Sequence, residues 1–113
     1  MKIVDGVYTY DINRKKCEQL TKKLLHEKKV RQLYLIVLPF SGTIVESGLF
    51  EIYAYSQLQQ KFYRQFWDEI VVVGMAKRKE DATQLVLEIV QDMYDCMGEN
   101  LDTNQFFLQK TGK

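Results

Sequence analysis

The chain has few of the residues on which disulfide scaffolds and zinc sites depend. It contains two cysteines, Cys17 and Cys96, and one histidine. A disulfide-stabilised domain carries several paired cysteines, and a structural zinc site needs four ligands, mostly cysteine and histidine. The sequence therefore predicts no disulfide, no metal site and no cofactor, and it favours a reducing compartment, the cytoplasm. We expect both cysteines to be small residues of the core.

Long apolar runs are also absent. The two longest, Leu33–Leu38 and Ile70–Ala76, fall far short of the roughly 20 residues with which a helix spans a bilayer. The first residues, Met1–Asp11, contain no continuous apolar stretch, so no secretory signal is predicted. We expect no membrane partner, and the length of 113 residues predicts a single domain.

The same two apolar runs predict the centre of a sheet. Both are apolar without alternation, which is typical of strands covered on both faces. Residues Lys2–Tyr10 are predicted as a further strand, with a bend or bulge at Gly6. Residues Gln105–Gln109 are predicted as a last short strand at an edge.

Amphipathic helices are predicted on either side of the central runs. The first ends near Lys28 and has Asp11 or Asn13 as its N-cap. The last, Glu80–Met97, has apolar residues at helical spacing, acidic residues at its start and Gly98 as its stop. Together these elements predict a single α/β or α+β domain, in which amphipathic helices cover a central mixed sheet.

The segment between the central runs allows two interpretations. Alternation over Leu49–Tyr55 indicates a half-covered strand, which a helix over Gln57–Trp67 would follow. Apolar residues also recur every four positions, which a single helix over Leu49–Phe66 would explain equally. We adopt the strand followed by a helix.

Aromatic residues are concentrated in this segment. If Leu58, Phe62 and Phe66 face the core from a helix, Tyr63 and Trp67 lie around its other side. Large aromatic rings outside a core are typical of partner surfaces. We therefore predict a non-enzymatic protein-interaction or regulatory module that forms a homo-oligomer, most simply a homodimer, or binds another protein. The predicted interface comprises Tyr53, Tyr55, Tyr63 and Trp67.

An alternative hypothesis is a small protein, or small enzyme, that binds an anionic ligand. A loop at Ser41–Thr43 follows the first central run, and a basic turn at Lys77–Lys79 follows the second. Open sheets with helical crossovers bind ligands beyond the carboxyl ends of their strands. This hypothesis places a site between the loop and the turn, although ordinary connections would explain the same residues. Its candidate ligand-binding residues are Ser41, Gly42, Thr43, Lys77 and Arg78.

A third hypothesis concerns nucleic acid, because cations are concentrated in the first helix. Phosphate binding requires little beyond such cations. However, Glu18 and Glu27 interrupt them and no RNA-binding sheet motif accompanies them, so nucleic acid is not an expected partner. The cations concerned are Arg14, Lys15, Lys16, Lys22, Lys23, Lys28 and Lys29.

No catalytic group is identified from the sequence. His26 lies on a charged helix, and Glu46 and Glu51 flank a loop. A catalytic histidine needs an orienting partner and a nucleophile nearby, and paired carboxylates need contrasting surroundings. We interpret all three as solvated side chains, and an enzymatic function is not predicted.

Overall fold

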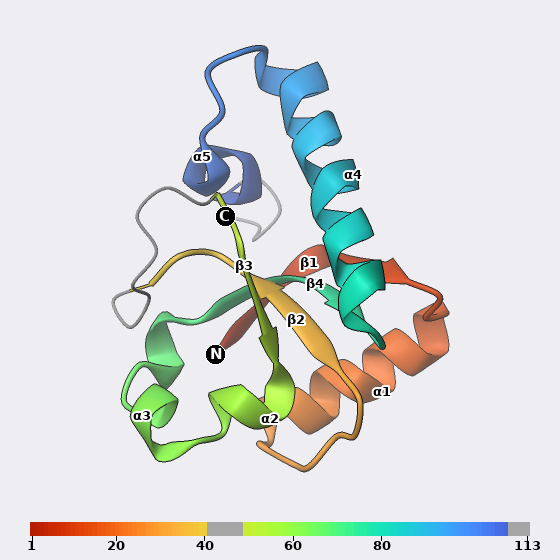
Figure 1. Cartoon of the computed structure of the whole chain (residues 1–113), viewed down its shortest axis with the longest axis vertical. Helices are drawn as coiled ribbons and strands as arrows, with labels where there is room; N and C mark the ends of the chain where they lie inside the picture. Colours follow the sequence, from red (N-terminus) through yellow and green to blue (C-terminus); the bar gives the residue numbers. More distant parts are fainter. Residues whose placement is uncertain (41–48, 109–113) are drawn as a thin grey trace.

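A computed structural model describes residues 1–40 and 49–108 of the chain (Figure 1). Four strands in these residues form one mixed sheet in the order β1-β4-β2-β3. The strands are β1 (Lys2–Tyr10), β2 (Tyr34–Val37), β3 (Glu51–Ala54) and β4 (Val71–Ala76). β1 and β4 are parallel, whereas β2 is antiparallel to both of its neighbours. The central strands β4 and β2 lie in the two continuous apolar runs, as predicted.

Helices cover both faces of the sheet, as Figure 1 shows. One face packs against the first helix and three short helical turns, and the other packs against the long helix and the last one. On the first face lie α1 (Arg14–Leu25), α2 (Tyr55–Leu58), α3 (Lys61–Arg64) and the 3-10 turn η1 (Trp67–Glu69). On the second lie α4 (Lys79–Met97) and α5 (Thr103–Leu108). The predicted class, one α+β domain with a helix-covered mixed sheet, is confirmed.

Strand β1 is bent where its glycine lies. Its pairing with β4 shifts register between Ile3 and Tyr8. Gly6, within this interval, has φ +69°, a conformation that glycine adopts without steric penalty. A hydrogen bond of 2.6 Å from the Tyr8 hydroxyl to Asp92 Oδ2 then ties the second half of β1 to α4.

The caps of α1 and α4 explain where these helices begin and end. The Asn13 side chain accepts a hydrogen bond of 2.8 Å from the Lys16 amide, so Asn13 is the N-cap of α1. Asp11 instead has φ +56° and lies in the preceding turn. Helix α4 ends at Gly98, whose φ is +70°. The residues that α4 buries are Ala82, Leu85, Ile89 and Met93.

Two element predictions are wrong. Residues Gln57–Trp67 do not form one helix, because extended backbone at Gln60 separates α2 from α3; strand β3 likewise rules out a single helix over Leu49–Phe66. Residues Gln105–Gln109 are not a strand, since Thr103–Leu108 are helical and Gln109 lies outside the described residues. A short apolar run does not by itself distinguish helix from strand.

The cysteines are less buried than predicted. Cys17 is half-buried beside the α1-side core, and Cys96 is exposed. Cys96 follows the buried Met93 by one helical turn, so it lies on nearly the same side of α4. At that point α4 extends beyond the sheet (Figure 1), which explains why the thiol is exposed.

Candidate anion-binding site

Three adjoining hollows lie around the connection between α1 and β2. Their volumes are about 500, 470 and 350 Å³, and Gln32 lines all three. The first, the α4-side hollow, includes Asp11 and Lys77, which directly follow β1 and β4. The second, the α1-side hollow, lies against α1, and the third, the β3-side hollow, reaches Ala54. The first two hollows thus lie at the carboxyl end of the parallel pair β1 and β4, and the third lies between the α1–β2 connection and the end of β3.

The α1-side hollow has a strongly basic lining. Five of its lining residues are cations, and the others are the apolar Leu20, Val30 and Leu33 and the neutral Gln32. The lining therefore contains no carboxylate. None of its cations forms an ion pair with a described carboxylate. Because several cations line one hollow and no carboxylate does, the hollow attracts anions. The five cations are Lys16, Lys23, Lys29, Arg31 and Lys77.

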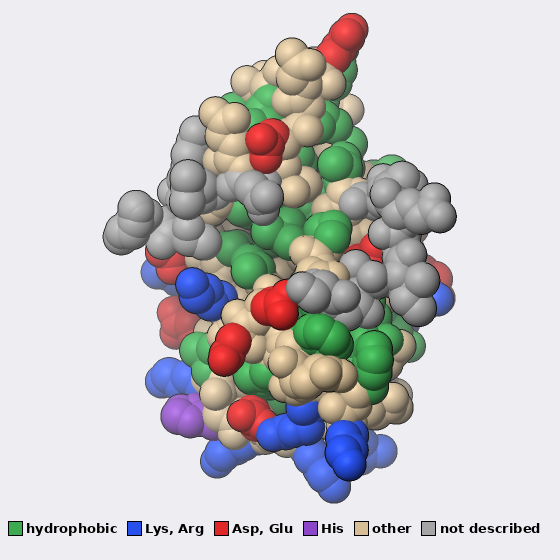
Figure 2. All heavy atoms as spheres, turned by 90° about the vertical axis from the view of Figure 1, so that its left-hand side faces the viewer, with side chains coloured by type: hydrophobic (Ala, Val, Ile, Leu, Met, Phe, Trp, Pro, Cys, Tyr) green, Lys and Arg blue, Asp and Glu red, His purple; other side chains and the backbone are tan. Residues whose placement is uncertain are grey.

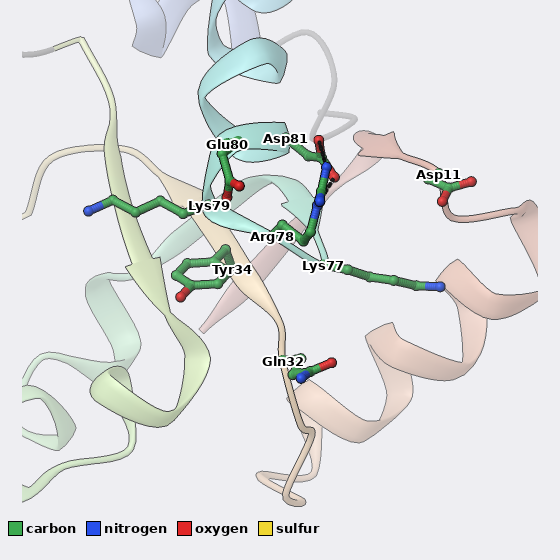
Figure 3. A pocket seen from close by; sticks show the side chains of 8 residues that line it. All are labelled: Asp11, Gln32, Tyr34, Lys77, Arg78, Lys79, Glu80 and Asp81. Carbon is green, nitrogen blue, oxygen red and sulfur yellow. Dashed lines mark hydrogen bonds and ion pairs between the residues drawn. The ribbon is translucent and has the colours of Figure 1, made fainter.

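Local structure explains how these cations converge. Lys16 and Lys23 are seven residues apart on α1, about two turns, and so lie on the same face, with the buried Leu20 between them. In β4, Met75 belongs to the α1-side core and Ala76 to the α4-side core. Alternation then directs Lys77 to the α1 side. Figure 3 shows Lys77 extending toward α1 and Lys79 extending the opposite way.

The α4-side hollow differs because it carries charges of both signs. Arg78 lies against Asp81, with Nε 3.3 Å from Oδ2 and Nη2 3.5 Å from Oδ1 (Figure 3). The hydrogen bond to Asp81 raises the pKa of Arg78 above its ordinary value. Asp11 and Glu80 add two further carboxylates to the lining. Arg78 is therefore already compensated. Because Lys77 and Lys79 balance Asp11 and Glu80, this hollow has no net charge and attracts phosphate less than the α1-side hollow does.

An aromatic ring lies where the α4-side and β3-side hollows meet. Tyr34 lines both, and its side chain is half-buried. Its neighbours across the sheet are Ala54 on β3 and Ala76 on β4. Because both neighbours are small, neither covers the Tyr34 ring along the sheet. The ring therefore forms part of the wall of the hollows.

The larger charge distribution agrees with this local picture. In Figure 2, Lys and Arg side chains gather at the end of the molecule where α1, α2 and α3 lie, and they are sparse at the far end of α4. All of the cations that the sequence indicated on and after α1 are exposed. Lys16, Lys23 and Lys29 line the α1-side hollow, while Arg14 forms an ion pair of 3.7 Å with Glu18.

The joint site between loop and turn stays a prediction, because its loop lies outside the described residues. Lys77 and Arg78 line hollows, but Ser41, Gly42 and Thr43 lie outside the described residues. The chain that leads to them leaves the sheet where the Leu38 amide donates to the Val71 carbonyl at 3.1 Å, beside the start of β4. Because β2 and β4 are antiparallel, this is the opposite end of the sheet from Lys77.

The predicted aromatic interface is largely internal. Tyr55 is fully buried and Tyr53 nearly so, while Tyr63 and Trp67 are half-buried against the same core. Burial raises the pKa of Tyr53 to about 12. The ring that is 53% exposed is Phe62, which was expected to face the core. Successive side chains of β3 point to opposite faces of the sheet. Because helices cover both faces, this alternation does not separate buried side chains from exposed ones.

Two of the three candidate catalytic residues lie in the described part of the chain. His26 is exposed, Glu51 is half-buried on β3, and Glu46 lies outside the described residues. The sequence did not identify Arg31, Gln32 or Tyr34 as site residues. Arg31 and Gln32 come just before a central strand, and Tyr34 is its first residue; this position is their only sequence signal.

The chain has no match among known protein families, curated proteins or solved structures. Among residues 1–40 and 49–108, no cluster of three histidine, cysteine or acidic side chains is placed to hold a metal ion. None of the helices in these ranges combines the length and apolar character needed to cross a membrane. Functional inference therefore depends on the chemistry of the hollows themselves.

Proposed function

We propose that the protein is a non-enzymatic binding module for a multiply charged anion, which occupies the α1-side hollow. One observation carries this proposal: five cations from α1, the α1–β2 connection and the end of β4 line one hollow without a carboxylate. Lys and Arg are charged at neutral pH. Their mutual repulsion is relieved when an anion with several charges, such as a chain of phosphates, binds between them.

The shape of the hollow also favours a ligand over plain solvation. Its volume of about 470 Å³ lies in the range typical of small-molecule sites. Its lining also includes Leu20 and Leu33, which are almost fully buried and add a small apolar contact surface beside the cations. The lining contains no histidine, cysteine or carboxylate to serve as a general base, in keeping with binding rather than catalysis.

Titration calorimetry with sodium tripolyphosphate tests the proposal. We expect binding by the wild-type protein that weakens as salt is added. The double variant Lys23→Gln, Lys29→Gln should lose at least about tenfold in affinity, because a hydrogen bond to a charged group contributes about 1.5–3 kcal/mol.

A matched double variant controls for the general charge of α1. Lys15→Gln, Lys22→Gln removes two exposed cations that do not line the hollow. It should lower the affinity by less than about threefold, since these two side chains would not contact an anion in the hollow and would act on it only at a distance through salt solution. Equal losses in both variants, or no binding by the wild-type protein, would contradict the proposal.

A second candidate function is self-association, favoured by the outer side of α4. Leu87 is 60% exposed and Tyr94 is 52% exposed. They are seven residues apart, about two turns, and the half-buried Val90 lies between them on the same face. Exposed apolar side chains that line up along a helix are typical of helix–helix contacts.

Light scattering tests this candidate at tens of micromolar protein. We expect the wild-type protein to be a dimer. The double variant Leu87→Gln, Tyr94→Gln should be a folded monomer, because the outer side of α4 loses its exposed apolar side chains. The control Phe62→Gln removes an exposed ring of the aromatic segment and should leave the dimer intact. A monomeric wild-type protein rules this candidate out, and loss of the dimer in the control alone would return the interface to the aromatic segment.

A further inference from the structure

The α1-side and α4-side hollows have different chemistry but share lining residues. Gln32 and Lys77 line both, so the hollows adjoin at the end of the sheet. The α1-side hollow has cations without a carboxylate. The α4-side hollow has as many carboxylates as cations and also contains the Tyr34 ring. A ligand that fills both therefore carries its negative charge at one end, and a ring with hydroxyl or amino groups at the other.

We infer that this ligand is a nucleotide, with its phosphates in the α1-side hollow and its base against Tyr34. The inference rests on the proposed function, which supplies the phosphate end. Stacking of a base on an aromatic side chain strengthens binding whichever base is present, because every base presents a flat face. The Tyr34 ring is available for such a contact because its cross-strand neighbours are Ala54 and Ala76.

The polar groups around Tyr34 fix the orientation of the nucleotide. Because its cations and carboxylates balance, the α4-side hollow attracts phosphate less than the α1-side hollow does. The carboxylates of Asp11 and Glu80 can accept hydrogen bonds from ribose hydroxyls or base amino groups. The Gln32 side chain can both donate and accept, and it lies between the two hollows. Lys77, which extends toward α1 in Figure 3, carries positive charge to the phosphate side of this boundary.

The decisive comparison is between ATP and tripolyphosphate, both without added metal, by titration calorimetry. Tripolyphosphate carries at least as much negative charge as ATP, so tighter binding of ATP must come from its nucleoside. We expect ATP to bind about tenfold more tightly. Tyr34→Leu should abolish this difference while leaving tripolyphosphate binding unchanged, and Tyr34→Phe should preserve it. Lys23→Gln, Lys29→Gln should weaken both ligands.

The outcomes separate the two proposals. If tripolyphosphate binds, but ATP binds no more tightly and Tyr34→Leu has no effect, the nucleotide inference is overturned and the anion site stands. If neither ligand binds, both fail. If a single-stranded oligonucleotide of ten uridines binds more tightly than ATP in a manner that Tyr34→Leu weakens, the site recognises nucleic acid and the mononucleotide inference is overturned.

A measurement on the wild-type protein guards against an unfolded Tyr34→Leu variant. Saturation-transfer NMR should give stronger transfer to the base protons of ATP than to its ribose protons, because the base lies against the ring. Stronger transfer to the ribose protons would overturn the inference without any substitution. Circular dichroism of each variant checks that the fold is retained.

Discussion

Replacing Ile89 by alanine is expected to lower the free energy of unfolding by about 2–5 kcal/mol. Ile89 is fully buried in the middle of α4, where it packs in the core cluster that also contains Ile36 and Val73. The substitution removes buried methyl groups and leaves a cavity that a close-packed interior fills only partly. Since a domain of this kind is stable by only about 5–15 kcal/mol, the loss is a large share of the total. Urea unfolding followed by circular dichroism measures it.

Leu87 provides the matched control for Ile89. It lies two residues earlier on the same helix but is 60% exposed. Leu87→Ala should change the unfolding free energy by no more than about 0.5 kcal/mol, because little surface is removed from the interior. Both variants are compared at micromolar protein, so that self-association through Leu87 does not contribute. If both variants lose the same free energy of unfolding, Ile89 does not lie on the side of α4 that packs against the sheet.

The elements that the sequence predicted well are those whose signal is local. The continuous apolar runs of β2 and β4 follow from burial on both faces, and α4 follows from a periodic stripe that ends at Gly98. The segment after β3 was predicted poorly. Its buried residues Tyr55 and Leu58 belong to the core on the α1 side of the sheet, and the segment that carries them consists of short turns without a regular apolar period.

Strand direction bears on the predicted two-loop site, whose loop lies outside the described residues. The sequence marks β2 and β4 as central but contains no local signal for their relative orientation. The prediction placed both carboxyl ends together, as in a parallel sheet, whereas β2 is antiparallel to β4. The basic turn does line the candidate site. Because β4 is parallel to β1, Lys77 and Asp11 lie at the same end of the sheet.

Only part of the candidate site was accessible from the sequence. Lys77 and the cations of α1 were identified as separate groups, but nothing indicated that they meet. Their convergence depends on the connection between α1 and β2, which turns at Glu27 and Gln32, with φ of +56° and +51°. These are conformations that a non-glycine residue adopts infrequently, so they are difficult to predict from composition.

Tyr55 combines complete burial with a hydroxyl that has no hydrogen-bond partner among the described residues. Its ring belongs to the core cluster with Leu24 and Leu58, and burial raises the pKa of its hydroxyl above the ordinary value. Ring and hydroxyl should therefore have opposite effects on stability. Tyr55→Ala should cost about 3–5 kcal/mol, as other losses of buried aromatic rings do. Tyr55→Phe should instead stabilise the protein by about 1 kcal/mol, because it removes an unsatisfied polar group.

The pH dependence of Tyr55→Phe gives an independent check on the same hydroxyl. Because its pKa is higher in the folded protein than in the unfolded chain, above about pH 10 the unfolded chain releases the proton first. Wild-type stability should therefore fall with rising pH in that range more steeply than that of Tyr55→Phe. Urea unfolding at pH 7 and at pH 10.5 measures both effects. If Tyr55→Phe instead lowers the free energy of unfolding by more than about 1 kcal/mol at pH 7, the hydroxyl is hydrogen-bonded in solution. The charged groups that act on this hydroxyl are Glu27 and Arg64, which form an ion pair with each other.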